Sequence, residues 1–133
     1  MAQIKSYTDI SQSKKLAEIL PIESADMYYP WYIEEDGDTI ESGHRISTPN
    51  VGNFTTHKVN KMILPCWSLA ALLEILAKIA SKIDDDGSAN LSSFMGQWSV
   101  NMFDCPVEAI DNYDNPVDAC VAMIKKLNEL KLL

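Results

Sequence analysis

The side chains best suited to chemistry are one cysteine and two histidines. Cys66 could form a thiolate–imidazolium pair with His44 or His57, and Ser68 stands at the expected start of a helix. A thiolate or an activated hydroxyl there would be a nucleophile. Their spacing matches no nucleophile-elbow, zinc-protease or phosphate-loop motif. A small enzyme or ligand-binding protein with a pocket near Cys66 is therefore an alternative function, but we predict no catalytic, cofactor-binding or metal-ligating residue.

Three consecutive carboxylates follow the longest apolar run of the chain. Asp84, Asp85 and Asp86 would lie just beyond a helix that ends near Ile83, where the helix dipole disfavours anions. A bound cation could offset that cost. The calcium-loop pattern counted from Asp84 fails, however, because it requires glycine where the chain has Ala89. We predict a solvated loop here, with cation binding as the alternative.

A third candidate is the segment from residue 23 to residue 41, which combines acidic and aromatic residues and contains no lysine or arginine. Aromatic side chains that carry a polar group dominate the binding energy of many protein interfaces. In a regular strand, half of them would point away from the core. The predicted partner-binding residues are Tyr28, Tyr29, Trp31, Tyr32, Glu34, Glu35, Asp36 and Asp38. The alternative is a strand that the protein's own loops and helices cover on both faces.

The charge balance restricts the class of partner. A net charge of −8 argues against a general affinity for nucleic-acid phosphates and for anionic membranes. Charged partners are expected to be basic, and an anionic surface could also mimic a nucleic acid in a basic channel. The three cysteines are widely spaced, and the first residues lack an apolar signal core, so we predict the reducing cytoplasm as the compartment.

The elements that must position these residues begin with the apolar run at residues 64–83. Leucines and isoleucines recur in it at spacings of three and four, which predicts a core helix opened by Pro65 or Ser68. The run is too short and too charged for a membrane span. A capping box at Asp9 and Gln12 predicts a helix over about 10–20, and Asn115 followed by a proline predicts another over about 116–131.

Strand patterns fill the intervals between these helices. Residues 22–35 and 39–47 predict a hairpin around a turn at 34–38, and residues 91–103 predict one strand with a polar face. Residues 48–60 and 104–113 read as irregular. A chain of 133 residues fits a single globular domain over 1–133. We predict an α+β fold, with about three helices packed on a small, mostly antiparallel sheet.

Residues 13–29, 65–73 and 115–121, the last with a leucine-rich tail, form a recognisable combination. They resemble a group of small, acidic, uncharacterised proteins from gut bacteria and their phages or mobile elements. The resemblance implies a bacterial or phage cytosolic protein and transfers no catalytic residue. The preferred hypothesis is a non-enzymatic accessory protein of a phage or mobile element that binds a protein partner through the acidic, aromatic surface around residues 26–41. A further alternative is a structural subunit or homo-oligomer that associates through the aromatic strand or through Leu130, Leu132 and Leu133.

Overall fold

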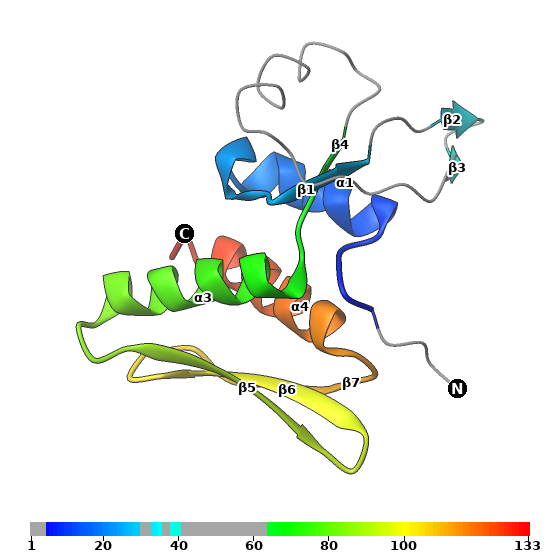
Figure 1. Ribbon diagram of the computed structural model, residues 1–133. Coiled ribbons are helices and arrows are strands. Elements are labelled where there is room, and N and C mark those ends of the chain that lie inside the picture. The colour runs from blue at the N-terminus through cyan, green and yellow to red at the C-terminus, as the bar shows by residue number, and fades with distance from the viewer. Residues whose placement is uncertain (1–4, 30–32, 36–37, 41–63) are drawn as a thin grey trace. The chain divides into compact units, whose positions relative to one another are not determined.

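The computed structural model describes residues 5–29, 33–35, 38–40 and 64–133 (Figure 1). The chain divides into two compact units, one made of Met1–Ser6 and Leu69–Leu133 and the other of Tyr7–Ser68. In the described part, three α-helices and small antiparallel sheets confirm the predicted α+β class. A single globular domain over 1–133 stays a prediction.

The unit Tyr7–Ser68 begins with helix α1, Ile10–Ile19, where the capping box is as predicted. The Asp9 carboxylate accepts from the Gln12 amide at 2.7 Å, and the Gln12 side chain accepts from the Asp9 amide at 3.1 Å. These two bonds satisfy amide groups that the first turn of a helix leaves unpaired. The helix buries Ile10, Ser13 and Leu16. Pro21 follows its end, and the chain continues into a short 3-10 helix η1, Ile22–Ser24.

Strand β1, Met27–Tyr29, pairs antiparallel with β4, Leu64–Cys66. The strand predicted from residue 22 begins only at Met27, because residues 22–24 form η1 instead. Of the two residues predicted to open the central helix, Ser68 directly precedes helix α3, Leu69–Ile83, whereas the prediction for Pro65 was wrong. Pro65 lies in β4 opposite Tyr28, and a proline without an amide donor is tolerated in a sheet of only two strands.

Strands β2, Ile33–Glu35, and β3, Asp38–Ile40, form a second antiparallel pair. Glu34 lies opposite Thr39 and Glu35 opposite Asp38. The pairing agrees with the hairpin predicted around residues 34–38. The rest of the predicted return strand, residues 41–47, and the predicted loop at 48–60 lie outside the described residues.

The other unit holds helix α3, Leu69–Ile83, then strands β5, Ser88–Phe94, β6, Gln97–Phe103, and β7, Ile110–Tyr113, and finally helix α4, Pro116–Glu129. The strands form an antiparallel sheet in the order β5-β6-β7. Both helices lie on one face of this sheet (Figure 1). The buried side chains of both helices and of β6 include Leu72, Leu76, Val100, Met102, Val121, Ile124 and Leu127.

The two helix predictions in this unit hold closely. The buried stripe of α3 includes Leu72 and Leu76, as its spacing predicted. At the start of α4, the Asn115 side chain accepts from the Asp118 amide at 2.9 Å. The helix ends at Glu129, earlier than predicted, and Leu130, just beyond it, is 49% exposed. Lys131 adopts a positive φ of 59°, which cannot continue a right-handed helix.

The prediction of one strand over 91–103 was wrong, because these residues belong to a hairpin. Strand β5 is paired along its whole length with β6, from Ser88 opposite Phe103 to Phe94 opposite Gln97. Met95 and Gly96 make the turn, with φ values of 51° and 79°. Positive φ at both central residues is the geometry of the tight turns that suit the twist of a hairpin. Residues 104–113 are also not wholly irregular, since β7 begins at Ile110.

Candidate functional site

The neighbourhood of Cys66 is a packed core. The Cys66 side chain has no exposed surface, and its Sγ donates to the Thr8 carbonyl oxygen at 3.4 Å. Burial raises the pKa of the Cys66 thiol to about 11. The thiol is therefore protonated at neutral pH, whereas a nucleophilic cysteine needs a lowered pKa. His44 and His57, its predicted partners, lie outside the described residues.

Thr8 organises the polar groups of this core. Its hydroxyl lies 2.7 Å from the Ser13 hydroxyl and accepts from the Trp67 amide at 3.1 Å. Its carbonyl oxygen accepts from the Tyr29 hydroxyl at 2.8 Å. Tyr29 is only 2% exposed, so this residue, predicted to bind a partner, lies in the core instead. Hydrogen bonding of buried polar groups is the ordinary requirement of a stable interior, and it accounts for this arrangement without a ligand.

The three thiols should differ in reactivity. We expect an alkylating reagent at pH 8 to modify the partly exposed Cys105 first and to reach the buried Cys66 and Cys120 at least about tenfold more slowly. The rate at Cys66 should still be rising with pH above 9, because its pKa is about 11. Mass spectrometry of the labelled peptides gives the three rates. Equal rates in denaturant are the control, and fastest labelling of Cys66 in the native protein would restore the enzyme hypothesis.

Asp84, Asp85 and Asp86 are exposed, and Asp84 forms the turn that ends α3. Its side chain accepts from the Asp86 amide at 2.8 Å, and its carbonyl oxygen accepts from the Gly87 amide at 2.8 Å. Asparagine and aspartate commonly bond their own backbone two residues on in this way. Within the described ranges, no group of three His, Cys, Asp or Glu side chains is placed to hold a metal ion.

The acidic and aromatic segment is described in part. Tyr28 and Tyr29 lie in β1, and the backbone of Glu34, Glu35 and Asp38 lies in the β2–β3 pair. Asp26, at the start of the segment, accepts from the amide and hydroxyl of Ser68. Its carboxylate is therefore committed to a structural contact. Trp31, Tyr32 and Asp36 lie outside the described residues.

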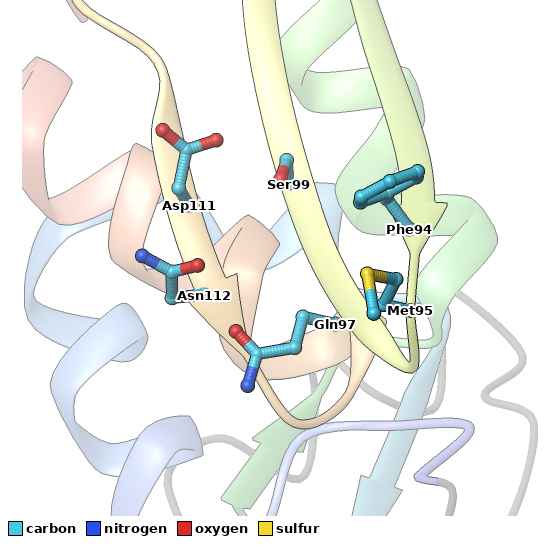
Figure 2. A pocket seen from close by; sticks show the side chains of 6 residues that line it. All are labelled: Phe94, Met95, Gln97, Ser99, Asp111 and Asn112. Carbon is cyan, nitrogen blue, oxygen red and sulfur yellow. The ribbon is translucent and has the colours of Figure 1, made fainter.

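An open groove of about 510 Å³ lies on the sheet face opposite the helices (Figure 2). It is lined by side chains from all three strands and from the hairpin turn: Phe94, Met95, Gln97, Ser99, Asp111 and Asn112. A bulge shapes one side of it. Trp98 pairs with Tyr113 and Val100 with Ile110, so two residues of β7 oppose Ser99. These two, Asp111 and Asn112, are exposed, and Asn112 has a positive φ of 68°.

The turn beside this groove was missed by the sequence reasoning. Phe94 is 78% exposed and Met95 86%, a large apolar surface for a turn. The available signal was Gly96, because a glycine between two alternating segments is typical of a hairpin. Methionine at a positive φ is conformationally unfavourable, and such residues persist where the surroundings or a function hold them.

Two substitutions in this turn should change stability in opposite directions. Gly96→Ala should lower the free energy of unfolding by about 1 kcal/mol, because a side chain is strained at a φ of 79° although nothing lies within 4 Å of the new Cβ. Met95→Asn should raise it by about 0.5 kcal/mol, since asparagine tolerates positive φ and the methionine packs little. Urea denaturation at low protein concentration measures both. Effects of the same sign would contradict the turn geometry.

Comparison with protein-family models, curated proteins and solved structures found no match. Of the helices in the described residues, none has the length and apolar character needed to cross a membrane. Any assignment of function must therefore start from the residues of this chain.

Proposed function

We propose that this chain is a non-enzymatic accessory protein of a bacterium, a phage or a mobile element that binds a basic protein partner through the acidic hairpin β2–β3. One observation carries the proposal. The strand register brings two acidic residues, Glu35 and Asp38, to directly opposed positions, with Glu34 beside them. Like charges at opposed positions of an antiparallel pair destabilise it. A basic partner would supply a counter-charge to these carboxylates.

The surrounding sequence strengthens this electrostatic argument. No lysine or arginine occurs from residue 16 to residue 44, so the segment brings no positive charge of its own to the hairpin. Complementary charge across an interface accelerates association and selects partners, an effect that salt screens over about 8 Å at physiological ionic strength. The partner is therefore expected to present lysine and arginine. A protein with a basic nucleic-acid channel is the sharpest case.

The fold narrows the binding residues relative to the sequence prediction. Of the predicted residues, Tyr29 drops out because it is buried. Asp26, which lies near them in the sequence, bonds Ser68. Tyr28 is half-buried in β1. Glu34, Glu35 and Asp38 are the residues to alter first, since their positions in the pair are known. The three cysteines are free thiols, which supports a reducing cytoplasmic location within this proposal.

The test is affinity capture from a lysate of the natural host, followed by identification of the retained proteins. The tagged wild type should retain a basic protein at low salt and release it as salt rises. The variant Glu34→Lys, Glu35→Lys, Asp38→Lys should retain at least about tenfold less of that protein. Its matched control carries the same change in net charge at exposed positions that are not part of the hairpin: Glu18→Lys, Glu108→Lys, Glu129→Lys.

Two outcomes would count against the proposal. Equal loss of capture in the hairpin variant and in the control variant would mean that binding depends on the net charge of the protein and not on the hairpin. Unchanged capture by the hairpin variant would place the interface elsewhere. Circular dichroism of all the proteins must show the same helix content, so that a loss of capture reports binding and not unfolding.

A further inference from the structure

Among the described residues, strand β5 is an edge strand without the usual protection. In the described part of the chain it pairs only with β6, and all seven of its residues are in regular register. Natural edge strands are commonly shielded by charges, prolines, bulges or short length. β5 has none of these between Ser88 and Phe94, whereas β7, at the other edge, is four residues long and carries the bulge and Asp111.

The main chain of β5 offers a regular row of hydrogen-bonding groups. In a tight turn, the residues that flank it, here Phe94 and Gln97, are joined by a main-chain bond. Because these groups alternate in direction along an antiparallel strand, those of Ala89, Leu91 and Ser93 point away from β6. Such groups bind water or another strand.

We infer that two copies of this chain associate by antiparallel pairing of β5 with β5, around a two-fold axis at Leu91. A two-fold contact uses the same surface on both copies. In this register Leu91 lies opposite Leu91 of the second copy, Asn90 opposite Ser92, and Ser88 opposite Phe94. The outward groups of Ala89, Leu91 and Ser93 then meet their counterparts, and the two three-stranded sheets become one sheet. None of the residues of the acidic hairpin takes part in this contact, so dimer formation is independent of the proposed partner binding.

The outer sheet face explains why this register is favoured. Phe94, Met95 and Phe103 are the large apolar side chains with the greatest exposure among the described residues, at 78%, 86% and 52%. Within one copy, Phe103 lies opposite Ser88. The pairing brings Phe94 of the second copy to the other side of Ser88. Two phenyl groups then flank a small serine, with Met95 of the second copy just beyond, and the symmetry repeats this cluster at the other end.

The inner face fits the same register. Val100 of β6 pairs with Leu91 on one side and with Ile110 on the other. Val100 has no exposed surface, whereas Leu91, at the sheet edge, is only half-buried and could bury more of its side chain in a contact. Pairing at Leu91 continues this apolar row without interruption into the second copy. A shift by one residue would place Leu91 opposite a polar residue of the outer face. The hydrophobic pattern of a strand fixes its register in a sheet, so the pairing at Leu91 is favoured.

The charges next to β5 in the sequence also permit the contact. β5 is uncharged, although the net charge of the chain is −8. The acidic residues Asp84, Asp85 and Asp86 precede it, and antiparallel pairing places the two sets at opposite ends. Their separation is at least about 20 Å at 3.4 Å per strand residue. That distance is more than twice the Debye length of about 8 Å at physiological salt.

Sedimentation equilibrium of the full chain, from about 1 µM to about 500 µM, tests the inference, because small interfaces are commonly of micromolar affinity. The wild type should show a reversible dimer. The variant Asn90→Lys, Ser92→Lys places lysines opposite lysines and should raise the dissociation constant at least about tenfold. The variant Asn90→Lys, Ser92→Glu places opposite charges together in the same register and should keep the dimer. Both positions are exposed, so the fold of one copy should be unaffected.

The register can be checked by mixing. The double-lysine variant and a double-glutamate variant, Asn90→Glu, Ser92→Glu, should each be largely monomeric and should form a mixed dimer when combined. A wild type that remains monomeric over the whole range would overturn the inference. So would a dimer that persists in the double-lysine variant, which would move the interface to another surface such as the Leu130–Leu133 tail.

Discussion

Trp67→Ala is expected to lower the free energy of unfolding by about 3 to 5 kcal/mol, the largest effect of any single substitution considered. The Trp67 side chain has no exposed surface. Its indole nitrogen donates to the Ser24 hydroxyl at 2.9 Å, and its backbone exchanges hydrogen bonds with Thr8. Alanine would leave a large cavity and remove the indole donor. Urea denaturation followed by circular dichroism measures the loss.

Trp98→Ala is the matched control for this prediction. Trp98 lies in β6 and is only half-buried, so its removal deletes less packed surface. Trp98→Ala should therefore lower the free energy of unfolding clearly less than Trp67→Ala does. If Trp67→Ala were as stable as Trp98→Ala, the core around Thr8 and Cys66 would be packed less tightly than the complete burial of Trp67 indicates.

The second large effect is expected at Ile124. Ile124→Ala should cost about 2 to 5 kcal/mol, because its side chain has no exposed surface and α4 packs on β6 and β7. Asn128→Ala, on the exposed side of the same helix, should change stability by less than about 0.5 kcal/mol. Denaturation of the two variants gives the comparison. Equal losses would mean that α4 contributes little packing energy.

Comparing Trp67→Ala with Ile124→Ala also tests the prediction of one domain. The two residues belong to different compact units of the chain. If the chain unfolds cooperatively as a single domain, both variants shift the same transition. Two transitions, each shifted by one variant, would identify two folding domains.

The helices could be predicted because their signals are local. The capping box at Asp9, the Asn115 cap and the leucine spacing of α3 each lie within a few residues of the element they define. Capping bonds and the helical period involve residues up to four positions apart, so one sequence contains the necessary information.

The strands were harder to predict, because their pairing partners are distant in the sequence or their alternating pattern is interrupted. β1 pairs with β4 from across the chain, which no local pattern reveals. Residues 22–35 carry aromatics on both alternating faces, so alternation alone could not decide that Tyr29 points inward and bonds Thr8. β7 escaped detection because its bulge interrupts the alternation.

The environment of Cys66 could not be predicted for a related reason. Thr8 and Cys66 are 58 residues apart, and only the fold shows that they share one buried, hydrogen-bonded core. A cysteine buried in this way behaves as a small apolar residue, and its raised pKa follows from that environment. The acidic hairpin, in contrast, could be predicted from composition and a turn signal, because both are local.

The most direct test of the central claim is the affinity of the captured partner for the purified protein, measured by titration calorimetry at two salt concentrations. We predict that the affinity falls at least about tenfold between about 50 mM and about 500 mM salt. The hairpin variant Glu34→Lys, Glu35→Lys, Asp38→Lys should bind too weakly to measure at either concentration. An affinity independent of salt, or retained by that variant, would contradict binding through the acidic hairpin.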